Sequence, residues 1–313
     1  MSTKTLPRKK HKNKISTGSL VADAIIYSIL ALFTFIFAYP LYQVIICSIS
    51  DPSIVAMKNG LMFWPEGVHF EAYKIVLQNK NLLTGLKNTL LYMTLGTTIS
   101  FFLTCMTAYP LIIPDLWGKR AIMFYFTLTM YFGGGMIPYF ILINKLGWMN
   151  TIWVMIIPGA VSGWNVIVRR TFYLSNIPNE IREAAQIDGA GHFRILFNIV
   201  IPLTMAINAM SIMFSCIGYW NMWLDPMIYM TDRSMYPLQS FLREILIDNS
   251  SMSLAGAAQS QSRLLTDNVH TKAAVNRLVK YANIVVSIVP ILCVYPLAQK
   301  HFVKGAIVGS LKG

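Results

Sequence analysis

A short polar stretch between two long apolar segments carries the residues best suited to specific chemistry. It reads EAAQIDGAGHFRILFNIVIP and runs from residue 183 to residue 202. Glu183 offers a carboxylate that can pair with a base of another protein, and the small side chains of Ala184 and Ala185 permit close approach. Gly189 allows a tight turn that a side chain would disfavour. The stretch therefore indicates a docking surface for another protein.

The residues around this stretch predict a helix, a glycine turn and a second helix. Pro178 suits a first helical position, with Asn176 upstream as its cap. Helical periodicity places four residues near one face: Ile181, Ala184, Ala185 and Asp188. Gly189 then ends the helix, and the segment HFRILFNIV forms a second one that runs into Pro202. The alternative interpretation is an amphipathic surface helix that only connects two membrane spans.

The composition of the whole chain decides what surrounds this stretch. The 313 residues are 55% hydrophobic and 12% charged, with a mean hydropathy of +0.52. A soluble domain is about 25% charged. A chain with so little charge cannot cover a surface that faces water, so we expect an integral membrane protein.

Six apolar segments are long enough to cross a bilayer as helices, which takes about 20 residues. They cover residues 21–49, 88–113, 121–143, 151–168, 199–224 and 281–299. Because backbone polar groups in lipid must be satisfied within the element, helices are expected. The first segment is too long for the apolar core of a cleaved signal peptide, so it is interpreted as a retained span.

The net charge of +13 has a strong N-terminal contribution. Six bases lie within the first 14 residues: Lys4, Arg8, Lys9, Lys10, Lys12 and Lys14. The positive-inside rule then places the N-terminus in the cytoplasm, and an even number of spans places the C-terminus there too. Outer loops are expected at 51–87, 144–150 and 225–280. A nucleic-acid-binding arm is the alternative interpretation of the basic N-terminus.

The expected spans lack the groups that a self-sufficient transporter uses. After Asp23, no acidic or basic residue lies inside any of them, whereas ion-coupled transporters usually place ionisable groups there. The chain also lacks the phosphate-binding pattern GxxxxGK[ST]. Energy for uphill transport would therefore come from a partner.

A secondary transporter of a small polar solute is the main alternative. A membrane-embedded enzyme would need a convergent catalytic or metal cluster, and a purely structural anchor would have no use for the docking stretch.

The spacing of the docking stretch resembles the EAA motif of the inner-membrane permeases of ABC importers. Six residues occupy the register of that motif: Glu183, Ala184, Ala185, Gly189, Ile199 and Pro202. Ile201 replaces the usual leucine, which keeps an apolar contact. The segments 87–111, 133–158, 219–230 and 295–313 resemble carbohydrate permeases of the maltose type, in particular the maltose-G-type partner and the oligosaccharide or polygalacturonan permeases of Gram-positive bacteria.

This resemblance implies an all-α integral membrane protein in a bacterial cell membrane, with the type I ABC importer permease fold, six transmembrane helices and both termini inside. Along the chain we expect a basic segment at 1–20, a first helix at 21–50, an outer loop at 51–87, a core domain at 88–300 and a cytoplasmic tail at 301–313. The EAA loop covers 178–202 within that core. The chain would form half of a pathway for a carbohydrate and would not be an enzyme.

The resemblance also implies the partners. They are a second permease subunit, two ATPase subunits that hold ATP and Mg, and an extracellular or lipid-anchored solute-binding protein; this chain itself would hold no cofactor, metal or nucleic acid. In such permeases the acid at the position of Glu183 pairs with an ATPase base. Lys304 and Lys312 in the tail would also reach the ATPase, unless the tail is simply a frayed end.

Candidate pathway residues lie near the outer end of the fifth expected span. Trp220, Asn221 and Trp223 could stack on and hydrogen-bond to a sugar, although tryptophan also lies at membrane interfaces for structural reasons. Three consecutive glycines at 133–135 indicate either a hinge in the third span or close packing of small residues.

Overall fold

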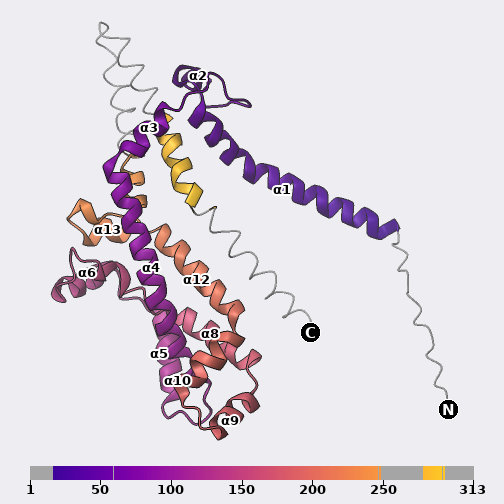
Figure 1. Cartoon of the computed structure of the whole chain (residues 1–313), viewed down its shortest axis with the longest axis vertical. Coiled ribbons are helices and arrows are strands. Elements are labelled where there is room, and N and C mark those ends of the chain that lie inside the picture. Colours follow the sequence, from indigo (N-terminus) through magenta and orange to yellow (C-terminus); the bar gives the residue numbers. More distant parts are fainter. Residues whose placement is uncertain (1–16, 59, 246, 248–277, 291, 293–313) are drawn as a thin grey trace.

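The computed structural model describes residues 17–58, 60–245, 247, 278–290 and 292, and the regular elements among them are helices. The longest helix of the bundle is α4 (Lys80–Ala108). Helices α8 (Gly163–Asn176) and α12 (Met205–Trp220) pack along α4, and α5 (Lys119–Tyr131) packs against α8 (Figure 1). The all-helical class expected from the sequence is confirmed for these residues.

Helix α4 begins earlier than the expected second span, at Lys80 instead of residue 88. Asn79 sets this start because its side chain accepts a hydrogen bond from the backbone N–H of Asn81. Small residues dominate the buried face of the helix: Gly85, Thr89, Gly96, Thr97, Ser100, Thr104, Cys105 and Ala108. Small side chains let neighbouring backbones approach closely, which explains why several helices converge on α4.

Helix α1 (Thr17–Ile49) forms over the first expected span and projects away from the bundle (Figure 1). Every side chain from residue 21 to residue 38 is exposed in the described structure, although the segment is strongly apolar. Only the last turns pack, where Ile46 and Cys47 meet Val55 of α2 (Pro52–Met57). The other described residues therefore leave most of α1 uncovered.

The third expected span is wrong as a single helix. It consists of α5 and α6 (Met136–Lys145), which meet at an angle of 117°. The three glycines lie at the break, and Gly135 has a φ of +82° that glycine adopts readily. A Cβ atom added to Gly133 or Gly134 would meet nothing within 4 Å. The glycines therefore break the helix, and close packing of small residues does not explain them.

The fourth expected span also differs. A short helix, α7 (Trp153–Ile156), stops before Pro158, and α8 begins only at Gly163. Proline disfavours helical backbone in the residue before it, and glycine follows here, so the interruption has a local cause. Helix α8 then continues past residue 168 to Asn176, which brings Arg169 and Arg170 into the helix.

The fifth expected span is bent by 86° between residues 192–203 and α12. The bend follows Pro202, whose ring nitrogen cannot donate a helical hydrogen bond. The Thr204 backbone N–H donates to the carbonyl oxygens of Val200, at 3.1 Å, and Ile201, at 3.3 Å. The Val200 oxygen also accepts from the Thr204 hydroxyl, at 2.7 Å, and the Ile201 oxygen from the Asn208 amide, at 2.8 Å. Side chains thus add hydrogen bonds to the carbonyl groups at the bend.

The sixth expected span is described only in part, as a helix over Leu278–Pro290, and residues 293–299 lie outside the described residues. By length and composition, the described residues contain two helices that could cross a membrane, or up to four if each bent pair counts as one span. The count of six and the orientation of the termini stay predictions.

Arg169 directly follows the fourth expected span, which ends at residue 168, yet it does not lie on the surface. It is 1% exposed and lies inside the bundle. One of its guanidinium nitrogens lies 2.7 Å from Asn208 Oδ1 of α12 and 2.7 Å from Cys105 Sγ of α4, and the group sits 5.1 Å from the centroid of the Phe101 ring. No carboxylate pairs with it in the described structure. The charge links three helices through neutral groups.

Candidate functional site

The predicted helix of the docking stretch is confirmed as α9 (Asn179–Ile187), at the opposite end of the bundle from α3 (Glu71–Gln78) (Figure 1). Its C-terminus closes as expected at Gly189, which has a φ of +76°. The N–H groups of Gly189 and Ala190 donate to the carbonyl oxygens of Gln186, at 3.0 Å, and Ala185, at 2.9 Å. This pair of hydrogen bonds, together with a glycine in the left-handed conformation, is the Schellman motif.

The predicted start of this helix was one residue off and its cap was wrong. Pro178 precedes the first helical residue and has extended backbone, with φ −58° and ψ 142°. Asn176 is the last residue of α8, and its side-chain amide donates to the carbonyl oxygen of Phe172 within that helix. Asn176 therefore serves the end of α8 and does not cap α9.

One face of α9 is fixed to the bundle. Ala185 is buried in the main apolar cluster, and Arg182 is 7% exposed. The Arg182 guanidinium donates to the carbonyl oxygen of Ile112 at 3.1 Å and to Asn179 Oδ1 at 2.7 Å. The expected grouping of Ala185 with Ile181, Ala184 and Asp188 on one face is not what the packing shows, because those three are exposed.

The other face of α9 is open to solvent. Glu183 and Ala184 are exposed, and so is Ile187, whose exposure reaches 87%. An isoleucine this exposed next to an acid and a small residue is a surface that another protein could cover. Asp188 lies at the exposed C-cap of the helix.

The second half of the docking stretch joins α9 to the bundle. It forms α10 (His192–Ile195), the π-helical turn η2 (Leu196–Val200) and α11 (Ile201–Leu203). Ile195, Leu196 and Val200 are buried in the same apolar cluster as Ala185, and Ile199 packs at its edge. Pro202 lies in α11 just before the 86° bend. Displacement of α9 would therefore act directly on the bend that begins α12.

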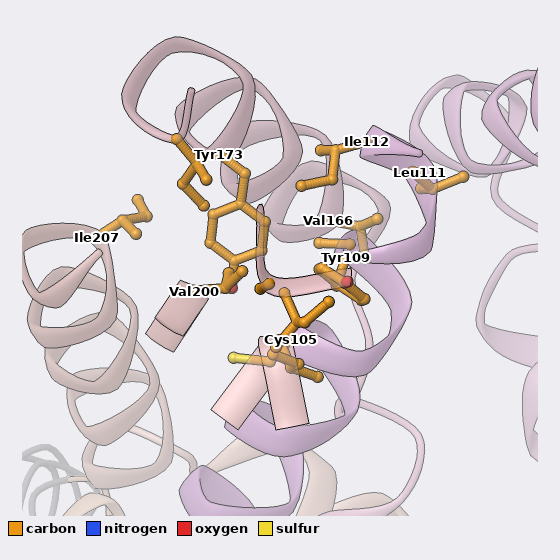
Figure 2. Packing of buried hydrophobic residues seen from close by; sticks show 13 residues of the cluster. Cys105, Tyr109, Leu111, Ile112, Val166, Tyr173, Val200 and Ile207 are labelled. Carbon is orange, nitrogen blue, oxygen red and sulfur yellow. The ribbon is translucent and has the colours of Figure 1, made fainter. Parts of the chain in front are cut away.

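The apolar cluster beneath the docking stretch connects it to α4 and α8. Figure 2 shows Tyr173 of α8 among Cys105 and Tyr109 of the α4 end, Val166 of α8 and Val200 of the docking stretch. All five of these side chains are at most 4% exposed. Such dense packing transmits displacement because cores rearrange in discrete steps and do not deform smoothly.

Three cations close the end of α4 where the docking stretch is attached. Beyond Ala108 the chain forms the turn η1 (Pro110–Ile112). Arg170 donates to the carbonyl oxygen of Leu111, Arg182 to that of Ile112 and Lys119 to that of Ile113, at 3.0–3.1 Å. Helix C-termini carry unpaired carbonyls and partial negative charge, which these cations satisfy. These three bases thus have a structural use at this end of the bundle.

A second feature is a pocket of about 440 Å³ between α4, α6, α7, α8, α12 and α13 (Leu224–Tyr229). Its aromatic lining residues are Tyr139, Phe214, Tyr219 and Tyr229, and its polar ones include Ser100, Asn165, Ser215 and Asp225. The rings of Tyr139 and Tyr229 stand edge to face with centroids 6.1 Å apart. A volume of this size and a mixed lining are typical of small-molecule sites.

The three residues suggested as pathway contacts do not line this pocket. Trp220 is 5% exposed and packs in the cluster formed with Leu238 and Phe241. Trp223 is covered on one ring face by the Arg243 guanidinium, 3.4 Å from the ring centroid. Asn221 is exposed and its amide donates to the carbonyl oxygen of Ile217. Their role in the pathway stays a prediction.

Sequence reasoning missed the pocket residues themselves. Asp225 is the first residue of the outer loop expected at 225–280, yet it lines the pocket together with Tyr139 and Tyr229. Its signal in the sequence was a single acid inside the apolar run around residues 219–230. The tail residues Lys304 and Lys312 lie outside the described residues.

Comparison with known proteins identifies the family. Residues 82–224 match the family described as binding-protein-dependent transport system inner membrane component. The chain is 34% identical over 291 residues to the polygalacturonan/rhamnogalacturonan transport system permease protein YtcP of Bacillus subtilis (strain 168), covering 93% of this chain and 98% of that protein. It is 30% identical over 274 residues to protein LplC of the same organism, covering 88% and 89%.

A solved structure agrees with these relatives. A chain of a bacterial ABC transporter involved in the import of the acidic polysaccharide alginate superposes with a TM-score of 0.78 and 30% identity, covering 92% of this chain and 98% of that one. Matches of this extent leave no large part of the relatives without a counterpart here. The chain therefore belongs to the binding-protein-dependent transport system inner membrane components, as a membrane permease subunit of a sugar ABC importer.

Proposed function

We propose that this chain forms half of the translocation pathway of an ATP-driven importer for an oligosaccharide, and that α9 couples it to the ATPase. Relatives named for polygalacturonan, rhamnogalacturonan and alginate support an oligosaccharide as cargo. The partners are a second permease subunit, two ATPase subunits and a solute-binding protein, in a multi-pass arrangement in the cell membrane. ATP and Mg belong to the ATPase subunits. Family membership favours this function over a self-sufficient secondary transporter.

The observation that carries the coupling role is that one face of α9 is buried and the opposite face is exposed. Arg182 and Ala185 fix its inner face to the end of α4, while Glu183, Ala184 and Ile187 remain uncovered. An ATPase base that pairs with Glu183 would pull on a helix that is already fixed to the bundle. The pull would then pass through the buried part of the docking stretch to the bend before α12.

The experiment is a co-purification of the tagged permease with its ATPase subunits, followed by ATPase measurement with the solute-binding protein. Glu183→Lys replaces the acid by a base, so an attractive contact becomes repulsive. Losing one partner of an interfacial charge pair costs about 2–5 kcal/mol, so recovery of ATPase should fall by at least about tenfold. The matched control is Glu71→Lys, the same charge change on an exposed helical first turn at the other end of the bundle.

Normal ATPase recovery with Glu183→Lys, or an equal loss with Glu71→Lys, would contradict coupling through α9. Purification of the chain without any ATPase or second permease, with transport intact, would contradict the importer itself. Lys304→Glu and Lys312→Glu test the proposed tail contact in the same assay. A loss with either reversal would support that contact.

A further inference from the structure

The pocket of about 440 Å³ between α4, α6, α7, α8, α12 and α13 has the lining of a carbohydrate site. Carbohydrates bind by placing their C–H faces on aromatic rings and their hydroxyl groups on polar atoms. Four rings and four polar side chains supply both kinds of contact: Tyr139, Phe214, Tyr219, Tyr229, Ser100, Asn165, Ser215 and Asp225. The described lining includes no lysine, arginine or histidine.

Asp225 is the acid of this lining, and nothing in the described structure pairs with it. The carboxyl group makes no hydrogen bond or ion pair with another described residue, and it lines the pocket together with Tyr139 and Tyr229. Asp225 as a whole residue is exposed, but neighbouring atoms partly desolvate its carboxyl group, which raises the pKa of that group. A carboxylate in such a place gains most from a ligand that brings hydrogen-bond donors.

We propose that this pocket binds an uncharged sugar unit, with the Asp225 carboxylate accepting hydrogen bonds from sugar hydroxyls, and that the same carboxylate excludes sugars bearing a carboxylate. This proposal rests on the proposed importer function and assigns a substrate class to it. A carboxylate has about four lone-pair sites and can hold two adjacent hydroxyls at once. The rings of Tyr139 and Tyr229, in edge-to-face contact, form the neighbouring aromatic wall.

The exclusion follows from charge. A sugar carboxylate in the pocket would lie near Asp225 without a cation in the described lining to compensate. At a separation of about 6 Å, with screening between that of water and that of a protein surface, the repulsion amounts to about a tenfold loss of affinity. An uncharged sugar of the same shape escapes this loss and gains the hydrogen bonds.

The first test measures the charge inside the pocket without using transport. In the purified importer, Cys216 and Cys293 are replaced by serine, while the fully buried Cys47 and Cys105 stay. Ser215→Cys then places a thiol in the pocket lining. Its rates of modification by a cationic and an anionic methanethiosulfonate are compared. Asp225→Asn should lower the cationic-to-anionic ratio about tenfold.

A thiol outside the pocket provides the control. Ser175→Cys lies on an exposed turn near the end of α8, and its reagent ratio should not respond to Asp225→Asn. An unchanged ratio at Ser215→Cys after Asp225→Asn, or an equal change at both thiols, overturns the proposal.

The second test measures ligand class by protection of the Ser215→Cys thiol. Matched trisaccharides of galactose and galacturonate, glucose and glucuronate, and mannose and mannuronate differ within each pair only at C6. At least one neutral member should protect at about tenfold lower concentration than its acidic partner, and Asp225→Asn should reduce that difference. Protection by no neutral sugar, or equal protection by both members of the effective pair, overturns the proposal. Failure of the importer function would appear instead as absent ATPase in the preparation, which thiol labelling does not measure.

Discussion

Gly96 should be the position on α4 where one added methyl group does the most damage. A Cβ atom there would lie 2.2 Å from Cζ and 2.4 Å from the hydroxyl oxygen of Tyr219 on α12. Both distances are far below van der Waals contact. Tyr219 is 7% exposed, so its ring can escape only toward the pocket that it lines or by separating α4 from α12.

The matched variant is Gly218→Ala on α12, next to Tyr219. A Cβ atom at Gly218 would meet nothing within 4 Å, so this change adds only helix propensity, worth about 0.5–1 kcal/mol. Gly96→Ala gains the same propensity but adds overpacking, which costs about 1–3 kcal/mol. Because propensity cancels between the variants, their difference isolates the clash. We expect the free energy of unfolding of the two variants to differ by about 3 kcal/mol, at the upper end of this range, because real contacts of 2.2 Å do not occur.

The assay is thermal unfolding of the purified importer in detergent. Unfolding is monitored by the amount of protein that still elutes as intact complex after heating. A difference of about 3 kcal/mol corresponds to a melting temperature about 5 °C lower for Gly96→Ala than for Gly218→Ala. In a Tyr219→Leu background, which removes the clashing Cζ, Cε1 and hydroxyl oxygen atoms, the cost of Gly96→Ala should shrink by at least about 1 kcal/mol. Equal melting temperatures for the two alanine variants, or no relief from Tyr219→Leu, would refute the packing of α4 against α12 described here.

Three further expectations concern the docking stretch and the segment after α1. Gly189→Val should destabilise the complex by about 1–2 kcal/mol, because its φ of +76° disfavours β-branched residues, and Gly189→Asn should cost less in the same melting assay. Arg182→Met should lower ATPase coupling while leaving α4 folded, because it removes the bond to the Ile112 carbonyl; wild-type coupling would contradict this. A hydrogen bond from Ser53 lowers the pKa of the Asp51 carboxyl, so its contribution to stability is complete above the usual value of 3.8 and is lost as the pH falls through the lowered pKa. Melting temperatures of Asp51→Asn should therefore depend less on pH below about 4 than those of the wild type.

The features that the sequence predicted correctly are those with local causes. The extent of α1 follows from one long apolar run, and α9 follows from a helix-prone stretch that ends at a glycine able to adopt positive φ. The register of the EAA motif identified the family because its spacing is fixed over the whole docking stretch. Each of these signals lies within a few turns of chain.

The features that the sequence missed depend on contacts between distant segments. Hydropathy gives the same value to a straight helix and to one bent at Gly135 or Thr204, so two bent pairs looked like single spans. The burial of Arg169 could not be predicted because its partners, Cys105 and Asn208, lie on other helices. Asp225 was expected in a loop because only the assembled bundle brings it to the pocket.

The exposed helix α1 has one more consequence, which concerns membrane thickness. Its apolar part covers 29 residues, and at 1.5 Å per residue that is about 44 Å, well beyond a hydrocarbon core of about 30 Å. A tilt of about 40°, near the upper limit observed for single helices, would shorten the span to about 34 Å. Over residues 21–38, no packing against the other described residues fixes that angle. Hydrophobic mismatch would then set the tilt angle of α1, so the helix should stand more upright in a thicker bilayer. The lipid composition would thereby change the geometry of the permease.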